Sequence, residues 1–205
     1  MGSTINKKIL ILDYGVANYS SIYNMLYKFS SFVFIGNSKQ LIKSSDLIIL
    51  PGVGTFFDAM KNLRKNDILE NLKKYYKAGN NILGICLGMQ ILTENSNEIN
   101  FTKGLNFING CTRLNNSGSH VGWNKVFFKK KNLFSKLQND LFYFQHSYNV
   151  KKIGNTQNLG YSYNNNEKIL SLIKVNNLVG TQFHPEKSQN SGLKFFNIYF
   201  SEIYE

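Results

Sequence analysis

The sequence has few residues of the kinds that mark several well-known protein classes. Its 205 residues include only two cysteines and three histidines. Two cysteines cannot form a disulfide-rich framework, and no spacing of cysteine and histidine resembles a zinc site, so we expect neither a metal nor another cofactor. The longest apolar runs, such as Leu47-Ile48-Ile49-Leu50, are far shorter than a membrane span, and the first residues do not resemble a secretion signal. These absences indicate a cytoplasmic protein that does not bind a membrane.

Arginine is also nearly absent, although the chain is basic. The formal net charge is +12, yet Arg64 and Arg113 are the only arginines, and the lysines are spread along the chain. No RNA-binding aromatic signature or helix-turn-helix arrangement accompanies them. We therefore interpret the charge as genome composition and a solvated surface, and we expect no nucleic-acid partner. The cluster Lys129-Lys130-Lys131 is interpreted as a hairpin or loop tip.

Strand-like and helix-like segments alternate in the first half of the chain. Apolar runs predict strands at 8–14, 32–35, 46–50 and 81–83, and helical spacing of apolar residues predicts helices at 18–29 and 67–78. Such alternation indicates a parallel sheet. After about Gly104, short β-like runs at 123–128, 141–148, 169–175 and 178–183 indicate an antiparallel part. Residues 154–167 are interpreted as a hairpin with a polar tip, and 191–203 as a closing helix.

The length allows one α/β domain with a sizeable core and is short for two domains. We therefore expect a single three-layer domain over residues 1–205. Its central sheet is predicted to be mixed and largely parallel, flanked by helices, with an antiparallel C-terminal portion.

A cysteine stands between a strand-like run and a helix-like run, with a glycine two residues away on each side. The segment is Gly84-Ile85-Cys86-Leu87-Gly88. A strand that turns abruptly into a helix pushes one side chain out, and the flanking positions must be nearly free of atoms. The pattern predicts a nucleophile elbow that presents the Cys86 thiol for attack. The alternative is a small buried cysteine at a tight turn.

A cysteine nucleophile needs a base, and the sequence offers only three histidines. His184 directly follows an apolar strand, where Pro185 ends the hydrogen-bond ladder and leaves the imidazole at the strand end. Glu186 stands two residues later, so its carboxylate can accept the imidazole N–H and fix the tautomer. Cys86, His184 and Glu186 are therefore a candidate catalytic triad. The alternative is a structural histidine in a strand-ending turn.

These residues, together with several others, resemble the class I (triad-type) glutamine amidotransferases. Within that class they resemble the glutaminase subunit of imidazole glycerol phosphate synthase, and the resemblance covers nearly the whole chain. It implies the flavodoxin-like fold of class I glutaminases. The segments that carry it are Asp13-Tyr14-Gly15 with Asn18, Pro51-Gly52-Val53-Gly54, Gly84-Ile85-Cys86-Leu87-Gly88-Met89-Gln90, His120-Val121-Gly122-Trp123-Asn124, His146-Ser147-Tyr148 and Gln182-Phe183-His184-Pro185-Glu186-Lys187-Ser188.

The resemblance implies that Cys86 attacks the side-chain amide of L-glutamine and releases ammonia, leaving a glutamyl thioester that water hydrolyses to glutamate. The implied donors to the oxyanion are the backbone N–H of Leu87 and that of Val53 or Gly54. His184 takes the thiol proton and returns it to the departing nitrogen. The residues implied to hold the glutamine are Gly52, Gln90, Glu98, Ser147 and Tyr148.

Free ammonia would be protonated and lost to water, so a glutaminase of this type is expected to dock on a synthase. The partner implied by the resemblance is a TIM-barrel (HisF-like) cyclase subunit of histidine biosynthesis. Trp123, the only tryptophan, is an interface anchor by residue type, although a core position is the alternative. The residues implied on the docking side are Asn18, His120, Trp123, Asn124 and Lys187.

Three other interpretations fit parts of the pattern. A paralogous glutaminase would keep the catalysis but supply a different synthase, such as one that amidinates a bacterial surface sugar. A non-catalytic binding module of the same fold would have an unreactive Cys86. A cysteine peptidase or another thiol hydrolase would use the same elbow but would not need Gln90 or the tryptophan segment.

Overall fold

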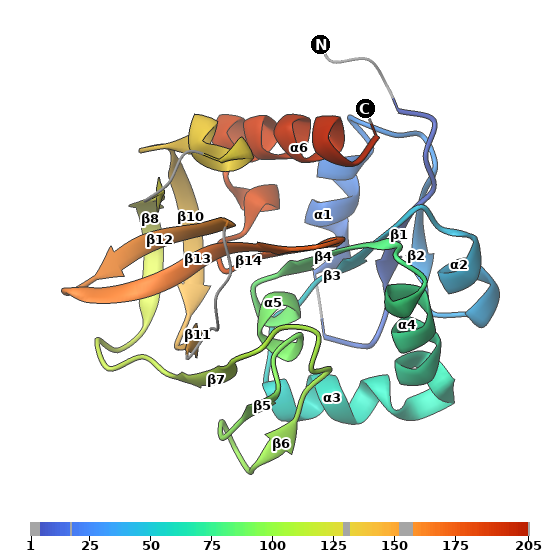
Figure 1. Ribbon diagram of the computed structural model, residues 1–205, viewed down its shortest axis with the longest axis horizontal. Helices are drawn as coiled ribbons and strands as arrows, with labels where there is room; N and C mark the ends of the chain where they lie inside the picture. Colours follow the sequence, from blue (N-terminus) through green and yellow to red (C-terminus); the bar gives the residue numbers. More distant parts are fainter. Residues whose placement is uncertain (1–4, 17, 129–131, 152–157, 205) are drawn as a thin grey trace.

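The computed structural model describes residues 5–16, 18–128, 132–151 and 158–204, and its centre is an eight-stranded sheet with helices on both faces (Figure 1). In spatial order the strands are β2 (Val33–Gly36), β1 (Ile9–Leu12), β3 (Leu47–Leu50), β4 (Asn81–Ile85), β14 (Leu178–Thr181), β13 (Glu167–Val175), β12 (Asn158–Asn164) and β9 (Phe127–Phe128). Pairing is parallel from β2 to β14 and antiparallel from β14 to β9. The predicted mixed, largely parallel sheet with an antiparallel C-terminal portion is confirmed.

The central strands are continuous apolar runs because both of their faces are covered. On β1, Ile9 and Ile11 join one core cluster, whereas Leu10 and Leu12 join the other. All four side chains are fully buried. A strand buried on both faces has no polar side to alternate with, so its sequence reads as an unbroken apolar run. This explains why the runs in the first half predicted strands correctly.

In the described residues, six α-helices form the outer layers. One core cluster packs against α1 (Tyr19–Leu26) and α6 (Gln189–Tyr204), and the other against α2 (Lys39–Ser44), α3 (Phe56–Leu63), α4 (Ile68–Lys77) and α5 (Leu87–Ile91) (Figure 1). Short 3-10 helices span Lys65–Asp67, Leu133–Leu137 and Pro185–Lys187. The helices predicted at 18–29, 67–78 and 191–203 are confirmed, with α1 ending three residues early. Neither α2 nor α3 was predicted.

Two smaller sheets accompany the central sheet in the described residues. One pairs β8 (His120–Lys125) with β10 (Leu141–His146), and the other contains β11 (Tyr148–Lys151), β7 (Cys111–Leu114), β5 (Asn95–Ser96) and β6 (Thr102–Lys103). The run predicted as one strand at 123–128 is therefore divided between β8 and β9. The run at 141–148 is likewise divided at Ser147, where the chain leaves one sheet and enters the other.

The polar hairpin predicted around 154–167 corresponds to β12 and β13. Its tip is Asn165-Asn166, where both residues have positive φ, a conformation that asparagine tolerates well. Residues 154–157 of that prediction lie outside the described residues, and so does the lysine cluster 129–131.

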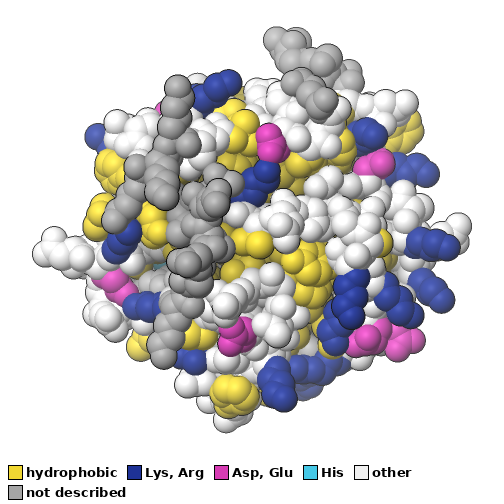
Figure 2. Space-filling model, in the orientation of Figure 1, with side chains coloured by type: hydrophobic (Ala, Val, Ile, Leu, Met, Phe, Trp, Pro, Cys, Tyr) yellow, Lys and Arg dark blue, Asp and Glu magenta, His cyan; other side chains and the backbone are white. Residues whose placement is uncertain are grey.

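Charged side chains are distributed over the surface rather than collected in one basic groove on the visible face (Figure 2). Lysines are more frequent on the side of α2 and α4, and acidic side chains lie among them there. On α4, Glu70 forms an ion pair with Lys73 at 2.9 Å. Within the described segments, no helix combines the length and apolarity needed to cross a membrane.

Candidate active site

Cys86 occupies a strained turn between β4 and α5, as a nucleophile elbow requires. Its backbone has φ 53° and ψ −107°, and its N–H donates to the Thr181 carbonyl at 2.7 Å. A Cβ atom at Gly84 would lie 2.7 Å from the Gly88 carbonyl oxygen, and one at Gly88 would lie 1.8 Å from the Leu50 carbonyl oxygen. Both flanking glycines are therefore required by backbone atoms that pass close by, which is the steric reason given for the sequence pattern.

The imidazole of His184 reaches the same place from the neighbouring strand. β14 runs parallel to β4 with Thr181 opposite Ile85, so the two strands end side by side. Pro185 then starts a 3-10 helix that carries Glu186. The Nδ1–H of His184 donates to Glu186 Oε1 at 2.8 Å, and the two side chains are 2% and 4% exposed. The structure thus forms the predicted histidine–glutamate pair.

The charge distribution favours a protonated His184 beside the cysteine sulfur. Burial by itself lowers the pKa of His184, but the Cys86 sulfur and the Glu186 carboxylate outweigh burial and raise it to about 10. Since Nδ1 is bound to Glu186, the other nitrogen, Nε2, is the one left to exchange a proton with the thiol. This buried nitrogen has no hydrogen-bond partner among the described residues.

Cys86 opens into a cavity of about 320 Å³, a size typical of small-molecule sites. The predicted residues that line it are Gly52, Val53, Gly54, Cys86, Leu87, Gln90, Glu98, Ser147 and Tyr148. The side chains of His184 and Glu186 are buried, and neither residue is among the lining residues. In the described parts of the chain, no three His, Cys, Asp or Glu side chains gather closely enough to hold a metal ion.

The loop that was expected to supply the second oxyanion donor packs tightly against the elbow. A Cβ atom at Gly52 would lie 2.6 Å from the Leu87 Cβ. The N–H of Val53 donates to the Val16 carbonyl at 2.8 Å. That N–H is therefore engaged and would have to turn before it could meet an oxyanion in the cavity. Gly54, with φ 122°, gives the loop a residue at which its backbone can rotate.

Gln90 and Glu98 line the cavity, but each already makes a contact within the protein. The side-chain Nε2 of Gln90 donates to the Tyr148 carbonyl at 2.7 Å. Glu98 Oε2 accepts the N–H of Phe56 at 2.5 Å, at the start of α3, which places the carboxylate at a helix N-terminus. Burial raises the pKa of Glu98. Both side chains thus have fixed positions facing the cavity.

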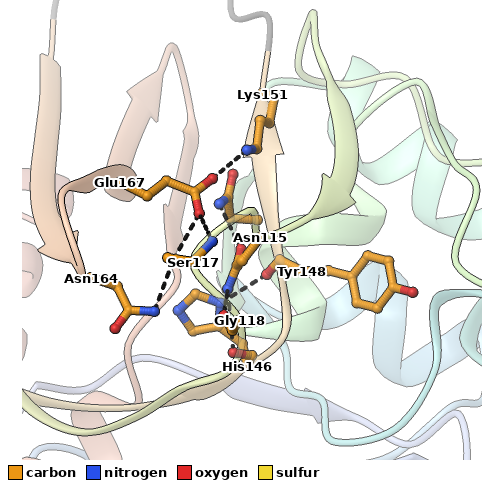
Figure 3. A network of polar contacts seen from close by, with 9 residues as sticks. Asn115, Ser117, Gly118, His146, Tyr148, Lys151, Asn164 and Glu167 are labelled. Carbon is orange, nitrogen blue, oxygen red and sulfur yellow. Dashed lines mark hydrogen bonds and ion pairs between the residues drawn. The ribbon is translucent and has the colours of Figure 1, made fainter.

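Glu167 ties the loop between β7 and β8 to β11 (Figure 3). Its carboxylate accepts the N–H and the O–H of Ser117, each at 2.8 Å, and forms an ion pair with Lys151. Burial would raise the pKa of Glu167, but these partners outweigh it and lower it to about 2. Further along the loop, Ser119 Oγ lies 2.9 Å from Ser147 Oγ, and both residues line the cavity. The network therefore fixes one side of the cavity.

The five residues implied on the docking side differ in exposure. Trp123 is 47% exposed, so the core alternative for it is wrong. Asn18 is exposed just before α1. Asn124 is half-buried, and Lys187 donates to the Gln145 side chain at 3.3 Å. His120 is buried and stacks on Phe144, so it can act on a partner only from behind the surface.

His120 and His146 form a buried, hydrogen-bonded pair beside the cavity. The Nδ1–H of His146 donates to the Tyr148 carbonyl at 2.8 Å, and its Nε2 accepts the Nδ1–H of His120 at 3.1 Å. Burial lowers the pKa of His120 to about 4 and that of His146 to about 3. Both imidazoles are therefore neutral near pH 7.

This pair predicts that the free energy of unfolding falls as the pH is lowered from 6.5 to 5. The unfolded chain protonates His120 and His146 near their ordinary pKa, whereas the folded protein resists protonation until about pH 4 and 3. Each histidine contributes up to about 1.4 kcal/mol per pH unit in this window. Urea unfolding at the two pH values measures the fall, and His146→Gln should remove about half of it.

Other groups do not account for this fall between pH 6.5 and 5, and Glu98, whose pKa burial raises, contributes with the opposite sign. Glu167 is ionised in both states, and His184, whose pKa is raised, already holds its proton in the folded protein, so its small contribution has the opposite sign. A wild-type free energy of unfolding that does not change across this window would contradict the assignment of a neutral histidine pair.

Sequence reasoning missed several residues of the site. Gln182 is fully buried, and its Nε2 lies 3.6 Å from Cys86 Sγ, while the Gln145 carbonyl lies 3.8 Å from the same sulfur. Gln182 was quoted as part of the segment that carries the resemblance, but it was given no role. The available signal was an amide side chain in an apolar strand, since a buried polar group needs a partner. Ser119, Val121, Gln145 and His146 also line the cavity and were not predicted to do so.

Comparisons with known proteins agree with this geometry. A family model described as "Glutamine amidotransferase class-I" matches residues 10–200. The chain is 40% identical over 196 residues to "Imidazole glycerol phosphate synthase subunit HisH 2" of Vibrio vulnificus, covering 91% of each chain. It is 36% identical over 202 residues to the HisH subunit of Lactococcus lactis, covering 96% of this chain and all of that one.

The fold is also shared with a solved structure. PurLQS from Thermotoga maritima aligns with a TM-score of 0.77 at 19% sequence identity, covering 97% of this chain and 100% of that chain. The matched family model and the sequence relatives show that the chain belongs to the class-I glutamine amidotransferase family.

Proposed function

We propose that this protein is the glutaminase subunit of an imidazole glycerol phosphate synthase. It hydrolyses L-glutamine to glutamate and ammonia and passes the ammonia to a TIM-barrel, HisF-like cyclase in histidine biosynthesis. The observation that carries the proposal is a cysteine at a strained elbow, open to a cavity and backed by a buried histidine–glutamate pair. The names of relatives that align over nine-tenths of the chain support the pathway.

The residues around Cys86 account for both halves of the reaction. His184 Nε2 holds the proton that the Cys86 thiol has given up, so the sulfur attacks the amide carbon as a thiolate while the carbonyl oxygen becomes an oxyanion. The N–H of Leu87 and an N–H of the 52–54 loop stabilise that oxyanion, and one such donor is typically worth about 10²- to 10³-fold in rate. His184 then protonates the nitrogen, the C–N bond breaks and ammonia leaves.

Hydrolysis of the thioester repeats these steps with water. His184 takes a proton from the attacking water, a second oxyanion forms, and the C–S bond breaks to release glutamate and regenerate the sulfur nucleophile. Glu186 keeps Nδ1 of His184 protonated and stabilises the imidazolium in both halves. Gln90, Glu98 and the 147–148 segment hold the substrate in the cavity.

The exposed face of the β8–β10 sheet is the docking surface in this proposal. The buried and exposed side chains alternate along both strands, so Val121 and Trp123 project together and are 64% and 47% exposed. Tyr143 lies opposite Trp123 with the two ring centroids 6.0 Å apart, and Lys187 Nζ lies over the Tyr143 ring, 5.7 Å from its centroid. Val121 also lines the cavity, so a partner bound on this face would cover the cavity mouth.

Trp123→Ala should weaken binding of the cyclase subunit from the same organism by roughly 10- to 30-fold, as expected for a central aromatic anchor. Titration of the cyclase by calorimetry measures the dissociation constant. Phe101→Ala is the matched control, because Phe101 is 66% exposed and lies outside the proposed surface. Equal binding by the two variants would contradict the docking surface.

Glutamine turnover measured with and without the cyclase tests the partner itself. The proposal expects glutamine-dependent synthesis of the cyclase product only when both proteins are present. Glutamine hydrolysis that does not respond to the cyclase, but responds to another ammonia-accepting synthase, would contradict the pathway and leave the glutaminase chemistry in place.

A further inference from the structure

Gln182 is a buried amide in direct contact with the nucleophilic sulfur. It follows β14 and precedes the Phe183-His184 pair, and its side chain is fully buried. Its Nε2 lies 3.6 Å from Cys86 Sγ, within the range of a hydrogen bond to sulfur. The thiol itself points its weak donor toward the Gln145 carbonyl at 3.8 Å. The sulfur is thus a donor to one neighbour and an acceptor from the other.

The orientation of the Gln182 amide is determined by its neighbours. Tyr148 offers a backbone carbonyl, which can only accept, so the atom of Gln90 that lies 2.7 Å from it must be the donor Nε2. The same Nε2 lies 3.1 Å from Gln182, whose facing atom is therefore the acceptor Oε1. This leaves Nε2 of Gln182 directed at the sulfur.

The Tyr148 carbonyl is held in turn by the buried histidine pair. His146 donates to it at 2.8 Å and accepts from His120 at 3.1 Å, and His120 accepts from the side-chain amide of Asn124 at 3.1 Å. Because both imidazoles are neutral, each has one donor and one acceptor, and their donors point toward the Tyr148 carbonyl, which also accepts from Gln90 on its other side. A continuous series of hydrogen bonds therefore extends from β8 to the Gln90 amide and, through it, to Gln182.

We propose that Gln182 is a further catalytic residue, whose side-chain amide donates to the Cys86 sulfur and stabilises the negative charge that the sulfur carries as nucleophile and as leaving group. Gln90 is the positioning residue that sets its orientation. The inference rests on the proposed glutaminase function and adds a residue to it. No proton is transferred, because Gln182 remains neutral and only its hydrogen bond strengthens when the sulfur loses its proton to His184.

A donor of this kind acts at two points of the reaction. Before attack, it favours the thiolate that forms when His184 takes the proton. When the tetrahedral intermediate of thioester hydrolysis collapses, the C–S bond breaks and the negative charge returns to the sulfur. The Gln182 amide then stabilises that charge a second time. The Gln145 carbonyl cannot do this, since it can only accept and repels an ionised sulfur.

The rate at which iodoacetamide alkylates Cys86 tests the proposal without relying on glutamine turnover. Only the thiolate reacts, so the rate at a fixed pH reports how well negative charge on the sulfur is stabilised. Gln182→Met keeps the length of the side chain and removes the donor. It should lower the rate of alkylation about tenfold and kcat by a similar factor, with KM for glutamine changed less than about twofold.

Two further variants complete the test. Gln182→Asn shortens the side chain by one methylene, which moves the amide away from the sulfur, and it should also lower the alkylation rate. This variant keeps the proposal testable if Gln182→Met does not fold. Gln138→Met makes the same substitution at a glutamine whose side-chain oxygen accepts the Phe128 N–H, away from the cavity, and should leave the rate unchanged. Mass spectrometry of the Cys86 peptide separates its alkylation from that of Cys111.

The outcomes distinguish this proposal from the proposed function. If folded Gln182→Met and Gln182→Asn proteins are alkylated at the wild-type rate, Gln182 is not a donor to the sulfur and the proposal is overturned. If the wild-type protein is alkylated at Cys86 but hydrolyses no glutamine with or without a cyclase, the proposed function fails, while the alkylation rates of the variants still decide whether Gln182 stabilises the sulfur.

Discussion

The Cys86→Ala protein is expected to hydrolyse glutamine roughly 10⁴-fold or more slowly than the wild type, because removal of a nucleophile leaves only the contributions of substrate binding and oxyanion stabilisation. The protein should remain folded. Alanine has no more difficulty than cysteine with φ 53°, and the loss of one buried sulfur costs about 1 kcal/mol. Glutamate release measures the activity, and urea unfolding measures the stability.

The second cysteine provides the matched control. Cys111 lies on β7 and is buried, but it is not among the residues that line the cavity. Cys111→Ala should therefore retain glutamine hydrolysis. Synthesis driven by added ammonium salt in the presence of the cyclase should survive Cys86→Ala, because ammonia then enters without the thioester. Ordinary glutamine turnover by the Cys86→Ala protein would remove the nucleophile assignment.

Gly88→Ala should prevent normal folding or destabilise the protein by more than about 4 kcal/mol, a value that only a few kinds of substitution reach. The new Cβ would lie 1.8 Å from the carbonyl oxygen of Leu50 and 2.7 Å from its carbonyl carbon. Because both atoms are backbone of a central strand, neither can move aside without displacing β3. Soluble yield and urea unfolding measure the effect.

Gly118→Ala is the control for the loss of a glycine as such. A Cβ at Gly118 meets nothing within 4 Å, although its φ of 79° makes alanine unfavourable there by about 1 kcal/mol. If Gly88→Ala folds with a stability within about 1 kcal/mol of Gly118→Ala, the close approach of α5 to β3 is not the reason for the glycine.

Local sequence signals predicted the centre of the fold, and tertiary contacts decided the rest. The parallel strands were predictable because burial on both faces leaves an unbroken apolar run. The helices α2 and α3 were missed even though Ser38 and Thr55 cap them, accepting the N–H groups of Leu41 and Asp58. That spacing is a helix-start signal, and the predictions overlooked it because both helices are short and polar on one side.

No local signal in the sequence marks the points at which the runs 123–128 and 141–148 are divided. Each reads as one continuous strand, yet each is divided between two sheets because its residues pair with different partners. Pairing between segments far apart in sequence is set by packing, which a single sequence does not display.

The site residues that lie in short segments with a recognisable local pattern were predictable. Cys86 and the His184–Glu186 pair each carry a local pattern, a glycine-flanked turn and a proline-terminated strand. The contact between Gln90 and Gln182 joins residues 92 positions apart and has no such pattern. Likewise, the N–H of Val53 could be named as a donor from the loop sequence, but the bond that engages it with Val16 depends on how two loops meet.

The place of β14 between β4 and β13 has a consequence for how the protein is made on the ribosome. Until residues 178–184 emerge, β4 lacks its neighbour and Cys86 lacks the His184 imidazole that the proposed mechanism needs, so we expect no glutamine hydrolysis. The open flank of β4 is also an unpaired sheet edge during this interval, of the kind that chaperones shield against aggregation. Addition of β14, a strand of four residues, therefore both pairs the open edge of β4 and brings His184 beside Cys86.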